Sequence, residues 1–72
     1  MASVANDTIA LNSKGLALGH LGKYEEAIGY YDKVVATKPN DTDALNNKGV
    51  ALGSLAKHEE AITYYEKVLA TN

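Results

Sequence analysis

Residues 6–38 read NDTIALNSKGLALGHLGKYEEAIGYYDKVVATK, and residues 40–72 read NDTDALNNKGVALGSLAKHEEAITYYEKVLATN. The two segments align without a gap at an offset of 34 positions, and 23 of the 33 aligned pairs are identical. A period of this length in a chain rich in helix-forming residues is typical of arrays in which helical hairpins stack on their neighbours. Such arrays present surfaces to partners and seldom catalyse reactions.

Each copy contains two segments with apolar residues at helical spacing. In the first segment, four residues fall at positions i, i+4, i+7 and i+11, a helix period rather than a strand period: Leu11, Gly15, Leu18 and Gly22. The second segment carries an apolar stripe formed by Tyr24, Ala27, Ile28, Tyr31, Val34 and Val35. Because the second copy repeats both patterns, the sequence predicts an all-α chain with four helices near residues 8–21, 24–37, 42–55 and 58–71.

Capping and breaking residues separate these four segments. The tripeptides 6–8 and 40–42, both Asn-Asp-Thr, supply capping side chains before the first and third helices. Gly22 suits a tight turn because glycine reaches the left-handed conformation at little cost. Ala56 stands at the equivalent position and costs on the order of 1 kcal/mol if that turn is left-handed. Pro39 ends the second helix, and the short connections require consecutive helices to pack antiparallel.

The composition argues against several classes of protein. The chain has no cysteine, so it has no disulfide and no thiolate metal ligand. The formal net charge is −2 with both signs interspersed, which disfavours a nucleic-acid partner. No apolar run approaches the ~20 residues of a membrane span, so we expect no membrane partner. The first residues, MASVAND, lack the features of a secretory signal, and we therefore expect a cytoplasmic protein. We expect residues 1–5 to be a disordered leader, 6–39 the first repeat and 40–72 the second.

No group of side chains resembles a catalytic or metal site. His20 and His58 are not equivalent in the repeat, and a zinc site needs three or four converging ligands. The pairs Glu25-Glu26 and Glu59-Glu60 fall in the first turns of helices, where acids stabilise the helix dipole. We therefore predict a protein that is not an enzyme, with no catalytic residue, no metal site and no cofactor.

The residues of the repeat resemble those of the tetratricopeptide repeat family over residues 6–72. The matching positions are Leu11, Gly15, Leu18, Gly22, Tyr24, Ala27, Tyr31 and Pro39 in the first copy, and Leu45, Gly49, Leu52, Ala61 and Tyr65 in the second. The resemblance implies two antiparallel helix–turn–helix hairpins stacked as a short right-handed solenoid. Lys14 and Lys48 stand where the family usually has leucine. We expect their alkyl stems to cover apolar surface while the ammonium groups reach water.

The resemblance also implies a concave groove, lined by the first helix of each repeat, that binds a peptide or a helix of a protein partner. The candidate groove residues are Ile9, Asn12, Leu16, Gly19 and His20 in the first copy, and Asp43, Asn46, Asn47, Val50, Gly53 and Ser54 in the second. Asn12 and Asn46 could bind a peptide backbone through their amides, or they could simply be solvated. Gly19 and Gly53 could keep the groove floor bare, or duplication alone could explain both.

One subclass of the family holds a C-terminal carboxylate with Lys, Asn and Arg side chains at set groove positions. Among those positions, only Asn47 matches here. Asn12, Leu16 and Asp43 stand where a lysine, an asparagine and a lysine would be needed. An acid at position 43 repels an acidic tail, so the sequence argues against this type of binding.

Self-assembly is the alternative function. The last helix carries an apolar stripe that needs cover from another repeat or another chain, and about three repeats are usually needed for stability. Homo-oligomers could provide that cover, or the helices on either side of Ala56 could fuse and exchange between chains through the 55–58 turn. The self-association candidates are Ala56, Ile62, Tyr65, Val68 and Leu69.

Overall fold

The computed structural model describes residues 7–71 and contains four α-helices and no strand within that range. The helices are α1 (Thr8–His20), α2 (Tyr24–Thr37), α3 (Thr42–Ser54) and α4 (His58–Ala70). The all-α prediction is confirmed, although α1, α3 and α4 each end one residue before the predicted position because that residue caps the helix. The expected leader, residues 1–5, lies outside the described residues, as do Asn6 and Asn72.

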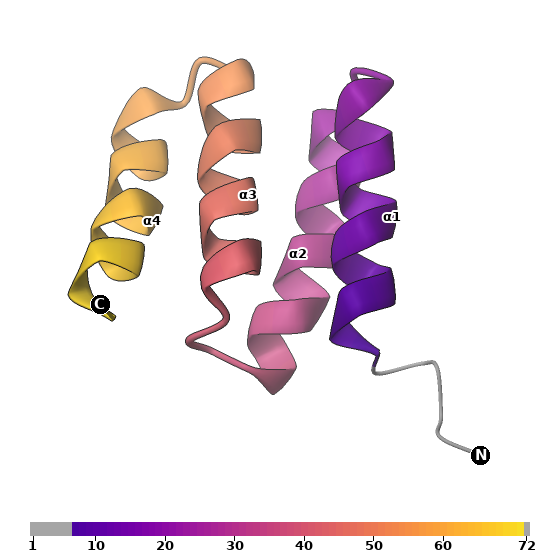
Figure 1. The fold of residues 1–72 in the computed structure, drawn as a ribbon. Coiled ribbons are helices and arrows are strands. Elements are labelled where there is room, and N and C mark those ends of the chain that lie inside the picture. Colours follow the sequence, from indigo (N-terminus) through magenta and orange to yellow (C-terminus); the bar gives the residue numbers. More distant parts are fainter. Residues whose placement is uncertain (1–6, 72) are drawn as a thin grey trace.

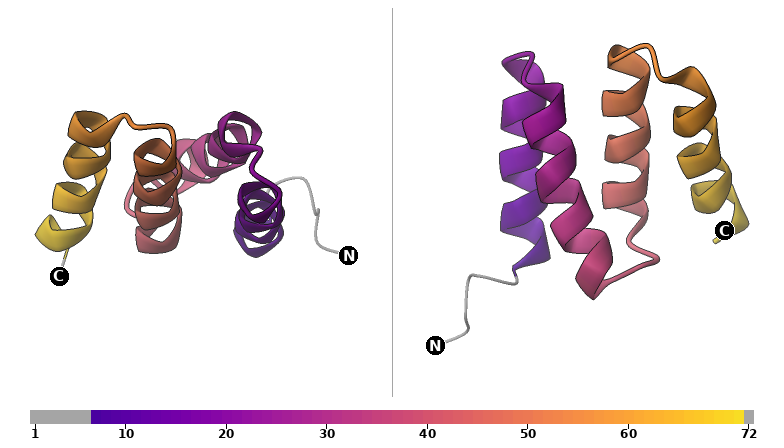
Figure 2. Two further views of the ribbon diagram at one scale, coloured as in Figure 1. Left: turned by 90° about the horizontal axis from the view of Figure 1, so that it is seen from above. Right: turned by 180° about the vertical axis from the view of Figure 1, so that it is seen from behind.

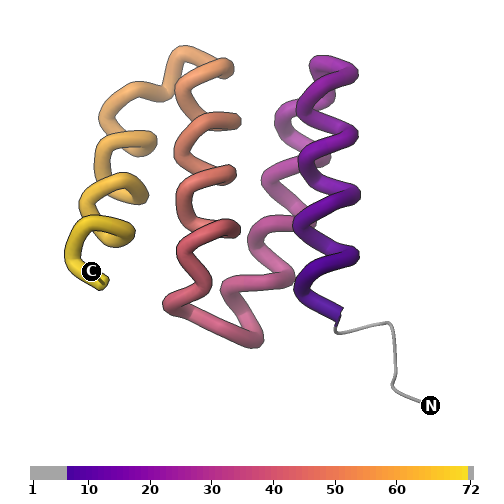
Figure 3. Tube along the Cα trace, viewed as in Figure 1, coloured from indigo at the N-terminus to yellow at the C-terminus, as the bar shows by residue number. Residues whose placement is uncertain are grey.

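The helices stand in a row and alternate in direction, so the chain passes up and down through two hairpins (Figures 1 and 3). α1 packs against α2 and α3 packs against α4, while α2 and α3 join the two hairpins. Within residues 7–71, α1 makes no contact with α4, and the two helices lie at opposite ends of the row (Figure 2). Each end helix therefore has one side without a neighbouring helix among residues 7–71.

The first and third helices begin at aspartate caps. Asp7 Oδ1 accepts hydrogen bonds from the backbone N–H groups of Ile9 and Ala10, at 3.0 and 3.1 Å. Asp41 Oδ1 accepts one from the N–H of Ala44 at 2.9 Å. Each bond satisfies a backbone donor that the helix itself leaves unpaired. The caps thus set the same starting point for α1 and α3, and this gives the two helices the same register.

The turns within the two hairpins have the same hydrogen bonds. In the first, Gly22 N–H donates to the Gly19 carbonyl at 2.9 Å and Lys23 N–H donates to the Leu18 carbonyl at 2.8 Å. The second turn repeats both bonds at the same lengths around Ala56. Gly22 has φ 80° and Ala56 has φ 64°, so both turns use a left-handed residue. Ala56 is thus a non-glycine residue at a position that favours glycine.

Replacing Ala56 with glycine should raise the free energy of unfolding by about 1 kcal/mol, because the left-handed backbone no longer carries a Cβ. The converse change, Gly22→Ala, should lower it by about the same amount. Urea denaturation followed by circular dichroism measures both. An unchanged midpoint for both variants would show that the turns do not constrain this position.

The core lies between neighbouring helices. Gly15 and Ala27 are buried and allow α1 and α2 to approach, while the Tyr31 ring fills the space beside Gly15 and is 2% exposed. Val34, one turn further along α2, is fully buried. Tyr30, by contrast, is only half-buried. Of the adjacent tyrosines Tyr30 and Tyr31, only Tyr31 therefore belongs to the core.

Lys48 connects the two hairpins. Its ammonium group, on α3, donates to the carboxylate of Asp32, on α2, at 2.6 Å. It also lies 4.5 Å from the centre of the Tyr64 ring on α4, a cation–π contact. The Lys48 side chain is only 15% exposed. Its ammonium is thus paired within the protein, whereas the sequence led us to expect it in water.

The pKa values of Tyr31 and Lys48 are both raised above their ordinary values. Burial raises the pKa of Tyr31 above its ordinary value. Burial works to lower the pKa of Lys48, but hydrogen bonds to Asp32 and Tyr64 outweigh it, and the net effect is a raised pKa. A group with a raised pKa stabilises the fold fully below its unfolded-state pKa and loses that contribution as pH rises through the folded-state pKa.

The free energy of unfolding should therefore fall as pH rises above about 10, the ordinary pKa of tyrosine and lysine. Urea denaturation across the alkaline range measures this dependence. Tyr31→Phe should make the fall less steep, since it removes one of the two groups. A variant with the same alkaline profile as the unmodified chain would rule out the Tyr31 contribution.

Candidate functional site

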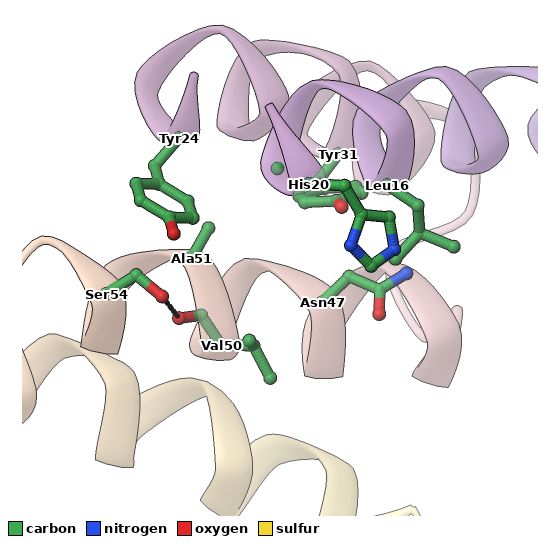
Figure 4. Close-up of a pocket in the computed structure, with 9 residues that line it drawn as sticks. Leu16, His20, Tyr24, Tyr31, Asn47, Val50, Ala51 and Ser54 are labelled. Carbon is green, nitrogen blue, oxygen red and sulfur yellow. Dashed lines mark hydrogen bonds between the residues drawn. The ribbon is translucent and has the colours of Figure 1, made fainter. Parts of the chain in front are cut away.

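A groove lies between α1 and α3, with side chains of α2 at its floor (Figure 4). Its first part has a volume of ≈ 220 Å³ and is lined by Leu16, Gly19, His20, Tyr24, Tyr31, Asn47, Val50, Ala51 and Ser54. Its second part, of ≈ 370 Å³, lies nearer the start of both helices and is lined by Thr8, Ile9, Asn12, Ser13, Leu16, Asp41, Asp43 and Asn47. Leu16 and Asn47 belong to both parts, so the two parts form one continuous groove.

The helix period explains which residues reach the groove. On α1, Ile9, Asn12 and Leu16 lie three or four positions apart and therefore share one face of the helix. On α3, Asp43 and Asn47 are related in the same way. These two faces are not equivalent in the repeat: in the stack, α1 presents one side to α3 and α3 presents a different side to α1, so the two meet across the groove.

Most of the predicted groove residues line this groove. Nine of the eleven candidates do so, namely Ile9, Asn12, Leu16, Gly19, His20, Asp43, Asn47, Val50 and Ser54. The other two, Asn46 and Gly53, lie outside both parts. They are two helical turns apart on α3 and share a side of that helix. In the repeat they correspond to Asn12 and Gly19, which lie on the side of α1 that faces α3. Asn46 and Gly53 therefore lie on the side of α3 that a following repeat would face.

The floor of the groove and part of its rim were not predicted from the sequence. Tyr24, Tyr31 and Ala51 line the first part, and Thr8, Ser13 and Asp41 line the second. The helix period places Tyr24 and Tyr31 on the apolar stripe of the second helix, and both pack in the core, but their side chains also line the groove. The i, i+7 spacing of these tyrosines was a usable signal, because both side chains must emerge on the same side of α2.

The groove combines exposed apolar surface with a few polar groups. Leu16 is 43% exposed and Val50 is 52% exposed, although both are large apolar side chains. Asn12 Oδ1 is buried and has no hydrogen-bond partner among residues 7–71. The Ser54 hydroxyl, by contrast, donates to the Val50 carbonyl at 3.1 Å (Figure 4). Leaving a buried acceptor unsatisfied costs about 1–3 kcal/mol, so Asn12 favours a ligand that donates a hydrogen bond.

The charges of the groove lie at one end. Asp41 and Asp43 line the second part, near the start of α3. Asp41 is engaged in the helix cap, while Asp43 is exposed. Two carboxylates at this end disfavour an acidic ligand group there. The groove is therefore suited to a neutral or basic segment with apolar side chains.

Residues 7–71 contain neither a cluster of metal-binding side chains nor a helix that could span a membrane. Across residues 7–71, no three His, Asp or Glu side chains converge as the ligands of a metal ion would. The four helices described in that range are each too short or too polar to cross a bilayer. Glu25, Glu26, Glu59 and Glu60 are all exposed in the first turns of α2 and α4. The groove is accordingly the candidate site that the described residues support.

A protein-family model described as tetratricopeptide repeat matches residues 7–71, which is nearly the whole chain. Searches of curated proteins and of solved structures gave no match.

Proposed function

Because the chain belongs to the tetratricopeptide repeat family, whose repeats generally mediate protein–protein interaction, we propose that its groove binds a peptide or a helix of a protein partner. The role is one of binding without catalysis. A cytoplasmic location also stays a prediction of the sequence. The observation that carries the proposal is the buried Oδ1 of Asn12, unpartnered among residues 7–71, beside exposed leucine and valine side chains in a concave site.

These features support a ligand with a defined chemistry. Leu16 and Val50 offer apolar contact from opposite helices, which suits a segment with one or two apolar anchors. Asn12 Oδ1 can accept a hydrogen bond from a backbone N–H of that segment. The carboxylates of Asp41 and Asp43 favour a basic residue, or none, at the adjoining end. We therefore propose a neutral or basic peptide with apolar anchors, and not an acidic C-terminal tail.

Selection of a random peptide library displayed on phage, with the immobilised 72-residue chain as target, tests this proposal. Enriched peptides should share apolar anchors and lack clustered acids. Their affinity should fall at least tenfold in Val50→Glu, because the change places a charge among the apolar contacts. Leu21→Glu is the matched control, since Leu21 is an exposed apolar residue outside the groove. Peptides that bind both variants equally well, or a selection without enrichment, would rule out the groove as the binding site.

The two helix glycines provide a second test with a built-in control. No atom outside its own local backbone lies within 4 Å of a Cβ placed on Gly19 or Gly53. Gly19→Ala and Gly53→Ala should each therefore stabilise the fold by about 1 kcal/mol through helix propensity. Only Gly19 lines the groove, so only Gly19→Ala should weaken a selected peptide. Unchanged peptide affinity in both variants would show that the bare floor has no role in binding.

Self-assembly is a second candidate function, supported by a separate observation. Ile62 and Leu69 on α4 are large apolar residues, and they are 53% and 70% exposed. Identical chains could cover this surface for one another. Exchange through the 55–58 turn is the less favoured route, because α3 and α4 here are separate helices joined by the same hydrogen-bonded turn as α1 and α2.

A further inference from the structure

The surface of α3 that packs against the first hairpin is repeated on α1, where it is more exposed. On α3, five residues have identical equivalents 34 positions earlier on α1: Ala44, Leu45, Lys48, Ala51 and Leu52 correspond to Ala10, Leu11, Lys14, Ala17 and Leu18. The four apolar residues on α3 are buried, whereas Ala10 and Ala17 are exposed and Leu11 and Leu18 are half-buried. The difference arises because α2 of the preceding hairpin packs on α3, while no preceding helix covers α1 within the described residues.

The surface of α2 that packs against α3 is similarly repeated on α4, where it is more exposed. Tyr31 and Val34 on α2 are buried, but their identical equivalents Tyr65 and Val68 are only half-buried. Leu69 is exposed, while its equivalent on α2 is half-buried. The α4 surface therefore resembles, in composition, the surface that α2 presents to α3.

The charges at the two ends are also complementary. Lys48 pairs with Asp32 across the hairpin contact. The equivalent of Asp32 is Glu66 on α4, which is exposed. The equivalent of Lys48 is Lys14 on α1, which lies 4.8 Å from the centre of the Tyr30 ring but forms no ion pair within residues 7–71. Lys14 is thus held by its own hairpin in the way Lys48 is held, without the acid from a neighbouring hairpin.

We propose that the chain self-associates head to tail, with α4 of one copy packed on α1 of a second copy as α2 packs on α3. Glu66 then lies opposite Lys14 of the second copy, in the relation that Asp32 has to Lys48. The inference develops the self-assembly candidate and does not depend on peptide binding in the groove.

This arrangement has two structural consequences. The contact joins different surfaces, so it leaves one end open after each addition and forms open-ended rows rather than closed dimers. It also creates a second groove between α3 of one copy and α1 of the next. Asn46 and Gly53, which lie outside the groove within one chain, are on the side of α3 that would face this second groove.

A two-fold pairing of α4 with α4 is the competing arrangement. That pairing would bring Glu66 near the same residue of the second copy, and like charges in an interface are unfavourable. It would also leave the apolar surface of α1 uncovered. The charge pattern therefore favours the head-to-tail contact.

Charge reversal at the two ends tests the proposal by sedimentation equilibrium of the 72-residue chain, from micromolar to millimolar concentration. The weight-average mass of the unmodified chain should rise with concentration. Lys14→Glu and Glu66→Lys should each weaken self-association at least tenfold, because each places like charges in the contact. An equimolar mixture of the two variants should associate again. Glu66 of the first variant then faces the unchanged Lys14 of the second, and the two substituted residues, which have opposite charges, face each other in the next contact.

Controls separate this result from a loss of folding. Lys38→Glu makes the same charge change at an exposed residue between the hairpins and should associate like the unmodified chain. Leu69→Lys should abolish association while its circular dichroism remains helical. A mass equal to one chain at millimolar concentration would overturn the proposal. So would Lys14→Glu chains that associate normally, because that result would indicate the two-fold α4 pairing. Peptides selected for the groove should bind Lys14→Glu normally, so the two proposals can fail independently.

Discussion

Replacing Gly15 with alanine should lower the free energy of unfolding by about 2 kcal/mol, because overpacking at this position costs about 3 kcal/mol, the upper end of its usual range. A Cβ at this position would meet the Tyr31 ring, at 2.9 Å from Cζ and 3.0 Å from Cδ1. Tyr31 is buried and cannot move away, because Ala51 of the next hairpin packs in the same cluster. The gain of about 1 kcal/mol in helix propensity offsets only part of this overpacking cost.

Gly49→Ala is the matched control for that prediction. Its Cβ would come equally close to the Tyr65 ring, at 2.9 Å from Cδ1 and 3.0 Å from Cζ. Tyr65, however, is half-buried on the open side of α4 and can rotate towards solvent. We therefore expect a loss of about 1 kcal/mol or less, since the strain is relieved and helix propensity improves. Urea denaturation measures both variants, and equal losses would contradict the claim that the following hairpin holds Tyr31 in place.

Leu52→Ala should have the other large effect, a loss of about 3 kcal/mol, within the range measured for leucine truncation in protein cores. Leu52 is buried on α3, which has a neighbouring helix on both sides. Truncation there removes apolar contacts and leaves a cavity that the flanking helices cannot close.

Its repeat equivalent, Leu18, is half-buried and packs only at the edge of the core. Leu18→Ala should therefore cost about half as much, because part of that side chain already contacts water. Thermal and urea denaturation of the two variants give the comparison. A loss for Leu18→Ala equal to that for Leu52→Ala would show that the first hairpin is packed as tightly as the second.

The local structure of the chain could be predicted from short stretches of sequence. The caps at Asp7 and Asp41 and the spacing of Leu11, Gly15 and Leu18 placed α1 and α3 to within one residue. Likewise, the alignment of Ala56 with Gly22 indicated a possible strained turn, and the φ of 64° at Ala56 confirms a left-handed residue there. These features depend on backbone geometry and on neighbours within a few positions, which is the information that a local sequence contains.

The groove could be predicted only in part. The helix period identified the face of α1 that contains Asn12 and Leu16. It also predicted that the equivalent face of α3 lines the groove. In the structure the two faces have different surroundings. α1 has α3 beside it, whereas no first helix of a further repeat lies beside α3 among residues 7–71. Asn12 thus lies in the groove and Asn46 does not. The tyrosine floor was missed because it comes from α2, whose position between α1 and α3 is a property of the packed hairpins.

Repetition in the sequence thus specified four helices, two identical kinds of turn and the residues available for packing. It could not specify which member of each repeated pair is buried. Tyr31 and Tyr65 are the same residue in closely similar local sequences, yet one lies between two hairpins and the other at an open end. The burial of a side chain depends on which helix packs against its own, and the position of the hairpin in the stack determines whether such a helix is present. Local sequence therefore determines each hairpin, and tertiary packing determines which surfaces remain exposed to bind a partner.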